Sequence, residues 1–408
     1  MSLEFKYYKI NDIGEVVSGG TPSTSKNEYW YGDIGWITPK DLSSYDDIYI
    51  SRGERNISSE GLNNSSAKLV PKNTVLMTSR APIGYIAIAN NELSTNQGFK
   101  SLICNEKICH YKYFYYWLKL NIKYIINNSN GSTFKEISGG TFKNLELSLP
   151  SLNEQKAISS VLWTIDEKIS VLKRINKNLT ICIDVNFKNN LLNFNQYSEQ
   201  ELVSSELGLI PKEWEVSNLT NIANYQNGLA MQKFPPENDA DCFKVLKIKE
   251  LRQGFFDETS DSCSKNIKEE CIVYDGDVIF SWSGSLLVDI WTGGTCGLNQ
   301  HLFKVTSSKF DKWFYYCWTK FYLDQFILIA KDKATTMGHI KRKHLDESLV
   351  LIPDKETYSK LTMLFKPLFD MLIKNKIEIK KLQNLRDVLM PKLMSGEVDV
   401  SKINCDLE

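Results

Sequence analysis

The sequence predicts an α+β protein with two similar globular domains of mixed strands and helices, each followed by a long helix. Three observations support this prediction. The chain has 408 residues, which at roughly 150 residues per domain suggests two or three domains. The second half of the chain repeats segments of the first half at a constant spacing, as repeat proteins do. Each copy is followed by an apolar heptad pattern, which is typical of a helix that packs along another helix.

Composition and charge exclude several classes of protein. With 42% hydrophobic and 24% charged residues, the chain is globular rather than disordered or fibrous. Its 49 basic and 49 acidic residues cancel, so any DNA binding must depend on local clusters. The sequence has no apolar run near the ~20 residues of a membrane-spanning helix, and its first residues resemble no signal peptide, so we expect a soluble, cytoplasmic protein. The nine cysteines lack zinc or redox spacing and are expected to be reduced thiols.

The matching segments are separated by a constant number of residues. The segments that end at Pro150 and Pro353 are 353 − 150 = 203 residues apart. Further upstream, residues 36–42 match residues 245–251 at an offset of 209. The first copy should therefore contain 209 − 203 = 6 extra residues. We expect them as a loop insertion within 43–66, because this segment is rich in Ser, Asn and Gly.

The heptad pattern after each copy predicts two long helices, over residues 151–192 and 354–392. At 1.5 Å per residue, about 35 residues span ~50 Å. The apolar stripe is narrow, so we expect the two helices to pack on each other, with two separate core helices as the alternative. Polar residues, namely Asn176, Asn375 and Arg386, occupy three positions of the pattern. Its apolar positions are Ile158, Leu162, Ile165, Ile169, Leu172, Leu179 and Ile183 in the first helix and Leu361, Phe365, Leu368, Leu372, Ile379 and Leu382 in the second.

Within each copy, short β-rich runs alternate with clusters of Gly, Asn, Ser and Pro, as in domains built from short strands. One aromatic-rich helix per copy is expected, beginning at His110 and at Asp311. Its aromatic residues recur at helical spacing, which favours a buried helix face over a surface that stacks unpaired bases. The expected boundaries are a first copy at 1–150, a first helix at 151–192, a linker at 193–206, a second copy at 207–353, a second helix at 354–392 and a tail at 393–408.

The common catalytic motifs are not recognisable in the sequence. Residues 19–26 resemble a phosphate-binding loop but lack its second glycine and the glycine before the lysine. The sequence has no Asp/Asn-Pro-Pro-aromatic loop of an adenine methyltransferase, and its four histidines form no metalloprotease motif. Asp354 is better explained as an acidic residue at a helix start than as part of a nuclease site. We therefore predict a non-catalytic binding protein with no catalytic residue, metal site or cofactor of its own.

Two similar domains on a stiff pair of helices suit the recognition of DNA. DNA repeats its groove every ~34 Å, and a protein that reads two half-sites needs a rigid spacer between its reading surfaces. Arg and Lys side chains bind guanine in the major groove, and Asn and Gln bind adenine. The candidates of this kind are Lys26, Arg52, Arg80, Asn96 and Gln97 in the first copy and Gln232, Lys247, Arg252, Asn299 and Gln300 in the second.

Phosphate contacts are expected to be unequal in the two copies. The second copy has a basic cluster before its last strand, whereas the matching part of the first copy has one lysine. The candidates are Lys333, Thr335, Thr336, Lys341, Arg342 and Lys343 in the second copy and Ser132, Thr133 and Lys135 in the first. Two alternatives stay open. The Asn-Gln pairs at 96–97 and 299–300 would hold a turn common to both copies, and the basic cluster would be a charged strand edge.

Six segments of the chain, in this order, match one known family: GDIGWITPKDL from Gly32, SRAPIGYIAI from Ser79, STNQGF from Ser94, PSLNEQKAI from Pro150, ELGLIPKEWEVSNLTNIA from Glu206 and LMPKLMSGEV from Leu389. With these segments the sequence resembles the specificity (S) subunits of type I restriction-modification systems, the HsdS family. The resemblance covers nearly the whole chain and follows the repeated order of that family. The start of the first copy, LEFKYYKINDIG, lacks the Pro-x-x-Trp found at Pro211–Trp214.

This resemblance implies two target-recognition domains related by pseudo-twofold symmetry, each reading one half of a split, asymmetric double-stranded DNA sequence. Two antiparallel helices would join them as a coiled-coil stem, set the length of the unread gap and dock two adenine methyltransferase (M) subunits. Restriction/translocase (R) subunits would join for cleavage, and S-adenosylmethionine, ATP and Mg²⁺ would belong to the partner subunits. Two alternatives stay open: an assembly hub whose domains bind protein or carbohydrate, and a hydrolase whose catalytic pair is split between the domains.

Overall fold

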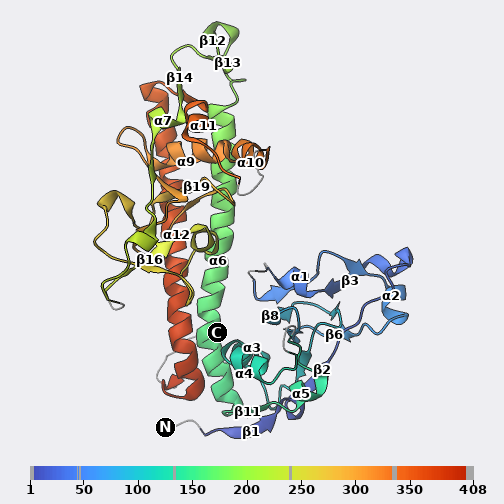
Figure 1. The fold of residues 1–408 in the computed structure, drawn as a ribbon. Coiled ribbons are helices and arrows are strands. Elements are labelled where there is room, and N and C mark those ends of the chain that lie inside the picture. The colour runs from blue at the N-terminus through green and yellow to red at the C-terminus, as the bar shows by residue number, and fades with distance from the viewer. Residues whose placement is uncertain are drawn as a thin grey trace. The chain divides into compact units, whose positions relative to one another are not determined.

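The computed structural model describes residues 4–43, 45, 47–131, 135–238, 241–332 and 338–400. The chain forms two compact units (Figure 1), of which unit 1 contains residues up to 170 and from 382 onward and unit 2 contains residues 171–381. The first copy lies in unit 1 and the second copy in unit 2, while the long helices α6 (Leu152–Leu191) and α12 (Lys355–Ser395) each contribute to both units. Every helix among the described residues is too short or too polar to cross a membrane.

Unit 1 folds the first copy into two main sheets and one strand pair. Its strands are β1 (Lys6–Lys9), β2 (Gly14–Val17), β3 (Trp30–Ile37), β4 (Tyr49–Ile50), β5 (Asn56–Ile57), β6 (Leu69–Val70), β7 (Val75–Ser79), β8 (Ile83–Ala89), β9 (Leu93–Thr95), β10 (Ser101–Cys104) and β11 (Glu146–Leu149). The sheets have the orders β2-β10-β7-β8-β4 and β5-β3-β9-β6, and β1 pairs with β11.

The helices of unit 1 besides the long ones are α1 (Pro39–Leu42), α2 (Ser59–Asn63), α3 (Tyr111–Leu120), α4 (Ile122–Asn127) and α5 (Gly139–Lys143). All of residues 113–118 in α3 are buried, which confirms that the aromatic run is core. The single helix expected here is two helices. The side chain of Asn121 donates a hydrogen bond to the carbonyl of Trp117 at 2.9 Å, and this bond between side chain and backbone favours the helix end at that residue.

Unit 2 repeats this organisation. Its strands are β12 (Leu202–Ser205), β13 (Gly208–Pro211), β14 (Glu215–Asn218), β15 (Asn224–Asn227), β16 (Phe243–Leu246), β17 (Ser262–Cys263), β18 (Ile272–Val273), β19 (Val278–Ser281), β20 (Leu287–Ile290), β21 (Cys296–Leu298), β22 (Leu302–Thr306) and β23 (Leu349–Ile352). Its shorter helices are α7 (Leu219–Ile222), α8 (Ile248–Gln253), α9 (Lys312–Phe321), α10 (Leu323–Asp332) and α11 (Arg342–Asp346). The sheets have the orders β15-β22-β19-β20 and β17-β16-β21-β18. As in the first copy, two helices, α9 and α10, replace the single one expected.

The hydrogen-bond registers of matched strands follow the sequence offsets. Lys6 faces Leu149 in the β1–β11 pair, and Glu215 faces Ile352 in the β14–β23 pair. The differences are 215 − 6 = 209 and 352 − 149 = 203, as the repeat requires. The parallel pairs β3–β9 and β16–β21 obey the same rule. The repeat is therefore confirmed, and the first strand is equivalent in both copies although the first lacks Pro-x-x-Trp.

The six extra residues of the first copy do not form one loop insertion. Gly35 of β3 matches Lys244 of β16 at an offset of 209. Their neighbours across the ladder are Asn56 and Ser262, which differ by 262 − 56 = 206. Strands β6 and β18 return to an offset of 203. Three extra residues thus precede β5 and three follow it, and the segment 43–66 contains β4, β5 and α2 rather than a loop alone.

The predicted linker over 193–206 is partly ordered structure. Its last residues form β12, which pairs with β13 in a hairpin whose turn includes Gly208 at φ +90°. A positive φ of this size is readily adopted only by glycine. The ring of Phe194 packs edge-on against Trp214, with centroids 5.2 Å apart. The segment expected as a linker therefore contains ordered structure, because apolar residues scattered through a polar stretch still find partners nearby.

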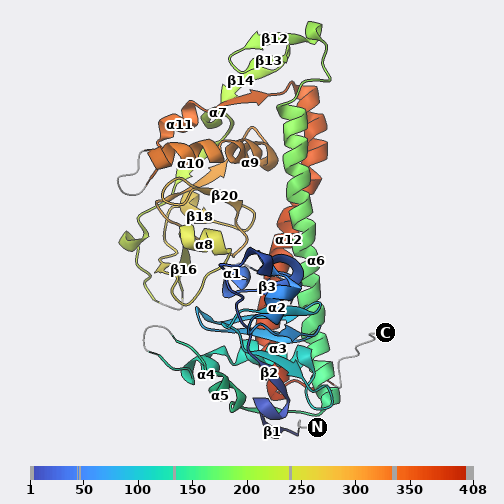
Figure 2. The same cartoon turned by 90° about the vertical axis from the view of Figure 1, so that its right-hand side faces the viewer.

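The long helices contact each other within each unit (Figure 2). Asn375 of α12 donates a hydrogen bond to Asn176 of α6 at 3.0 Å in unit 2. Arg386 forms an ion pair with Asp166 at 2.7 Å in unit 1. The heptad positions Ile158, Leu162, Ile169, Leu172, Leu179, Ile183, Leu361, Phe365 and Leu372 are buried, and Ile165, Leu368, Ile379 and Leu382 are partly buried.

Polar contacts also tie each copy to the long helices of its own unit. The hydroxyl of Tyr116 in α3 donates a hydrogen bond to Asp166 of α6 at 2.8 Å. In unit 2, Lys320 of α9 forms an ion pair with Asp184 of α6 at 2.8 Å. The aromatic helix of each copy is therefore fixed to α6 by a group that carries charge.

Candidate nucleic-acid interface

Two matched turns carry the Asn-Gln pairs of the two copies. In the first copy, Oδ1 of Asn96 accepts a hydrogen bond from the backbone N–H of Gly98 at 2.9 Å. In the second, Oδ1 of Asn299 accepts one from the backbone N–H of His301 at 3.2 Å. Side chain to backbone bonds of this kind are typical of turn-forming asparagines. Both asparagines thus have the turn role that the sequence left open as an alternative to base contact.

A glycine in an earlier loop packs against each of these turns. A Cβ atom on Gly19 would lie 2.0 Å from the carbonyl oxygen of Thr95, and one on Gly228 would lie 2.2 Å from that of Leu298. The backbone N–H of the residue after each glycine donates to the same carbonyl at 2.9 Å. No side chain fits at these distances. Both copies therefore use one backbone framework to place the glutamine that follows the asparagine.

The two glutamines are accessible at these turns. Gln97 is exposed, and its Oε1 accepts a hydrogen bond from the hydroxyl of Thr21. Gln300 is partly exposed, and its Nε2 lies 3.4 Å from Nε2 of His301. An accessible carboxamide can bind the donor and acceptor of an adenine edge. The glutamines are therefore better placed than the asparagines to contact a base.

A groove of about 750 Å³ in the second copy brings together four of its five candidates for base contact. It lies at the ends of β16 and β21 and along the start of α8. Arg252 is exposed on α8 but does not line the groove. The candidates that line it are Gln232, Lys247, Asn299 and Gln300.

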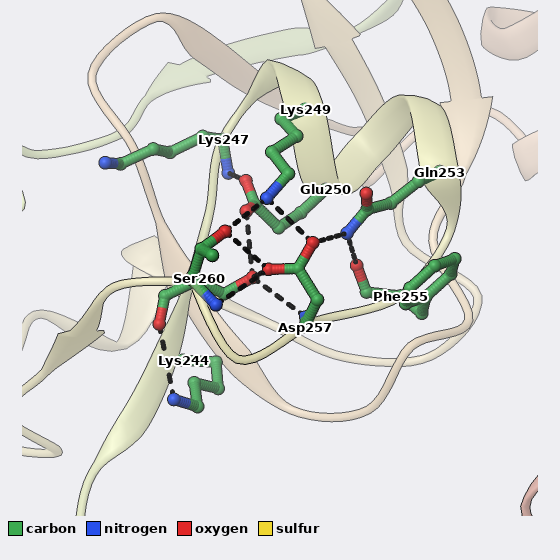
Figure 3. A network of polar contacts seen from close by, with 9 residues as sticks. Lys244, Lys247, Lys249, Glu250, Gln253, Phe255, Asp257 and Ser260 are labelled. Carbon is green, nitrogen blue, oxygen red and sulfur yellow. Dashed lines mark hydrogen bonds and ion pairs between the residues drawn. The ribbon is translucent and has the colours of Figure 1, made fainter. Parts of the chain in front are cut away.

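A buried glutamate supports the wall of this groove (Figure 3). The side chain of Glu250 is only 2% exposed. It accepts hydrogen bonds from the backbone N–H of Lys247 at 3.3 Å and from the hydroxyl of Ser260 at 2.9 Å. The first of these bonds caps the N-terminus of α8. Satisfied hydrogen bonds on a buried carboxylate fix the backbone that presents the lysines.

The lysines at the groove are held by acidic residues. Lys249 lies 2.7 Å from the carboxylate of Asp257, and its hydrogen bond, together with that from Thr259, holds the pKa of Asp257 below its usual value. Lys247 forms an ion pair with Asp261. Exposed ion pairs are weak. A phosphate or base edge can therefore replace the carboxylate at modest cost.

The first-copy candidates have less uniform surroundings. Lys26 and Arg52 are exposed. The ammonium group of Lys26 donates a hydrogen bond to the Tyr29 hydroxyl at 3.0 Å, which raises the pKa of Lys26. Arg80 is half-exposed, and its Nη1 lies 3.6 Å from the carboxylate of Glu136. The structure thus places a carboxylate beside Arg80, which the sequence did not reveal.

The basic cluster of the second copy forms helix α11 rather than a strand edge, because a side chain of its first turn caps its N-terminus. Lys341, Arg342 and Lys343 are all exposed. Arg342 donates a hydrogen bond to the carbonyl of Tyr225 at 2.7 Å, and Lys343 pairs with Glu347 at 3.2 Å. Helix α5 is the counterpart in the first copy, where 342 − 139 = 203. The idea of a charged strand edge is therefore wrong.

The remaining phosphate candidates precede α5 and α11 in the sequence. Lys135 of the first copy is exposed. The others lie outside the described residues, namely Ser132, Thr133, Lys333, Thr335 and Thr336.

Sequence reasoning missed one residue of the groove that stands out in the structure. His301 is exposed, and its Nδ1 lies 3.0 Å from the hydroxyl of Ser283. The available signal was the repeat offset of 203, which makes His301 the equivalent of Gly98 in the first copy. A side chain present in one copy and absent in the other at a matched turn marks a position where the two copies differ in what they can bind.

Comparison with solved structures supports the fold. The crystal structure of the type I restriction-modification system S subunit from M. genitalium superposes with a TM-score of 0.61. It covers 96% of this chain and 96% of that chain at 17% sequence identity. At this identity the likeness concerns the fold alone.

Sequence comparison extends this result to the family. The family described as the type I restriction modification DNA specificity domain matches residues 3–180 and 211–382, one match for each copy. The MjaIX specificity subunit of Methanocaldococcus jannaschii is 37% identical over 97% of this chain and 94% of that protein. The EcoR124I/EcoR124II specificity subunit of Escherichia coli is 29% identical over 40% of this chain and 41% of that protein. The protein therefore belongs to the family of type I restriction-modification specificity subunits.

Proposed function

We propose that this chain recognises double-stranded DNA as the specificity subunit of a type I restriction-modification complex, and that each copy reads one half of a bipartite, asymmetric target. The observation that carries this proposal is the duplicated turn at Asn96 and Asn299. The two turns share the backbone hydrogen bond to the carbonyl of Thr95 or Leu298 and the bond that the asparagine Oδ1 accepts, whereas the residues at the matched positions 98 and 301 differ. A common scaffold with different contact residues is what the reading of two different half-sites requires.

Contacts to phosphate and to bases divide between two sets of residues in this proposal. The exposed basic residues of α11, together with Lys135 in the first copy, would hold the duplex through its phosphates. Gln97 and Gln300 and the lysines of the second groove would contact base edges. Phosphate contacts position the protein, and base contacts select the sequence.

The long helices act as the spacer of this reader. We infer an antiparallel coiled coil that relates the two copies by a pseudo-twofold axis. Within unit 2, Asn176 faces Asn375, while Tyr197, after the end of α6, lies near Asp354, before the start of α12. Burial and this nearby carboxylate both raise the pKa of Tyr197. The two contacts support opposite helix directions, and a paired stem of fixed length would set the unread gap.

The outer faces of the same helices are the proposed docking surface for two adenine methyltransferase (M) subunits. These faces leave several large apolar side chains exposed, which a bound partner subunit would cover. Restriction/translocase (R) subunits would join this assembly in the cytoplasm, where DNA is found. The exposed side chains are Val171, Ile175, Ile181, Val185, Met363, Leu364, Met371, Leu385 and Val388.

Chemistry would take place on the partner subunits, so that this chain is not itself an enzyme. S-adenosylmethionine, ATP and Mg²⁺ would bind there. Adenine must leave the base stack before it is methylated, and this chain contributes by placing each M subunit over its adenine.

The test is methylome sequencing of a host with and without this gene, combined with fluorescence anisotropy of the chain and its M subunits on duplex DNA. We expect one asymmetric bipartite motif that depends on the gene, and an affinity that falls steeply with salt. The absence of duplex binding at every salt concentration would favour an assembly hub that binds protein or carbohydrate. Cleavage of DNA by the isolated chain, lost on mutation of a carboxylate, would favour a hydrolase.

A further inference from the structure

One backbone contact is common to the two copies but carries different side chains. In the first copy an isolated antiparallel bridge joins Arg80 to Glu136. In the second copy the equivalent bridge joins Ser283 to His339. The offsets are 283 − 80 = 203 and 339 − 136 = 203. The backbone pairing is thus the same in both copies, and only the side chains at it differ.

The positions around this bridge form a corner beside the Asn-Gln turn. The first corner consists of Arg80, Gly98, Lys100 and Glu136. The second corner consists of the residues at the same offset, Ser283, His301, Phe303 and His339.

The first corner is charged, and a carboxylate lies beside its arginine. Nη1 of Arg80 faces the Glu136 carboxylate at 3.6 Å, and the Arg80 side chain remains 39% exposed. Nε of Arg80 lies 3.7 Å from the position that a Cβ atom on Gly98 would occupy. The arginine side chain thus packs against the turn at Gly98. Lys100 beside it is buried, and burial lowers its pKa.

The second corner is aromatic and contains no arginine or lysine. His301 occupies the place of Gly98, and its Nδ1 lies 3.0 Å from the Ser283 hydroxyl. The ring of Trp282 lies 6.1 Å from His301, 6.3 Å from His339 and 5.7 Å from Phe303, measured between centroids. His301 and His339 are both exposed. Of the two, His301 also lines the groove of the second copy, so its imidazole is the polar group that takes the place of the guanidinium of the first corner.

We propose that this corner determines specificity in each copy: Arg80 reads a guanine in one half-site, and His301 contacts a base in the other half-site that need not be guanine. The inference rests on the proposed function as a bipartite DNA reader. A guanidinium with a carboxylate on one side keeps its other N–H groups available to bind the O6 and N7 atoms of guanine. Ser283 and His301 have no group that presents this fork of donors.

The experiment uses the full chain expressed with its M subunits, and reads the methylated motif by sequencing host DNA. In R80A, discrimination at one G·C pair of one half-site should fall about 10- to 100-fold, because one bidentate contact is lost. In R80K the same pair should relax, since lysine keeps the charge but not the fork. In H301A the change should fall in the other half-site. The exposed Lys72 provides the control, because K72A removes a charge outside the corner and should leave the motif unchanged.

A reciprocal variant tests for gain of the contact. S283R/H301G rebuilds the arginine and the open turn of the first corner in the second copy, and should increase the preference for guanine in the second half-site. The melting temperature of this variant, measured beside that of the wild type, shows whether it is folded. If R80A does not fold, R80K serves as the conservative alternative.

The outcomes separate this inference from the proposed function. A wild-type complex that methylates a bipartite motif, with R80A and R80K leaving every position of it unchanged, would overturn the role of the corner and leave the function standing. Loss of all methylation in both variants, with no position relaxed, would also overturn it. A wild-type complex without a bipartite motif would overturn the function itself, and the corner with it.

Discussion

Asn375 of α12 donates a hydrogen bond from Nδ2 to Oδ1 of Asn176 of α6 at 3.0 Å, and both side chains are more than 90% buried. The pair lies in an otherwise apolar heptad pattern. Any shift of one helix along the other would bury both amides without partners, at a cost of a few kcal/mol. The two asparagines therefore favour one register of the helix pair, as single polar residues do in coiled coils.

Replacement of one asparagine should weaken the fold. N375A leaves the Asn176 amide buried without its partner, so we expect the free energy of unfolding to fall by about 1–3 kcal/mol. Urea denaturation measures this change. The double variant N176L/N375L should be neutral or more stable, because both polar groups are removed together. The control is N178A, at an exposed asparagine of α6, which should have little effect on the free energy of unfolding. An equal loss of stability in N178A would show that the buried asparagine pair contributes nothing particular.

The ion pair between Asp166 and Arg386 should contribute more to the free energy of unfolding than the ion pairs on the surface do. Their side chains are 5% and 18% exposed, and Asp166 also accepts the hydroxyl of Tyr116. R386M leaves a buried carboxylate without its counter-charge and should cost about 3–5 kcal/mol of stability. The control is K366A, because the Lys366–Asp370 pair on the same helix is mostly exposed and should contribute at most about 1 kcal/mol. Similar losses in both variants would contradict the buried role.

The stability of unit 1 should depend on pH through His110. Burial, with help from Lys112 and Lys156, lowers the pKa of His110 from 6.5 to about 4. Between these values the unfolded chain binds more protons than the folded chain, so this contribution is complete above about pH 6.5 and is lost as the pH falls toward 4. H110Q should flatten this part of the profile of unfolding free energy against pH. H301Q, at an exposed histidine, is the control, and an unchanged profile in H110Q would refute the assignment.

Lengthening the helices should move the two half-sites apart. One heptad added to each of α6 and α12 at facing positions lengthens the stem by about 10 Å, which corresponds to about 3 base pairs. Methylation sequencing should then show the same half-sites with a longer gap. Four residues added to each helix instead would disrupt the heptad pattern and should reduce stability. An unchanged gap after the heptad insertion would show that the helices do not act as the spacer.

Several elements were predictable because their signal is local or periodic. The two long helices follow from the heptad pattern, and their predicted ranges, 151–192 and 354–392, lie within a few residues of the observed bounds. The equivalence of the two copies follows from constant offsets that the strand registers reproduce. The misses are short elements in polar segments: β4, β5 and α2 within 43–66, β12 in the expected linker, and α11 in the basic cluster. Strands of two residues have no usable period, and their pairing depends on partners far along the chain.

The sequence by itself determined that the protein is a duplication with two heptad helices. Repetition can be read from the order of the residues alone, and heptad periodicity follows from local helix geometry. Only the tertiary structure decided which polar groups meet. Asn176 pairs with a residue 199 positions away, and the Ser283 hydroxyl meets an imidazole that the sequence did not single out. Such contacts depend on how whole elements pack, since hydrogen bonds between distant residues form only after burial has brought their elements together.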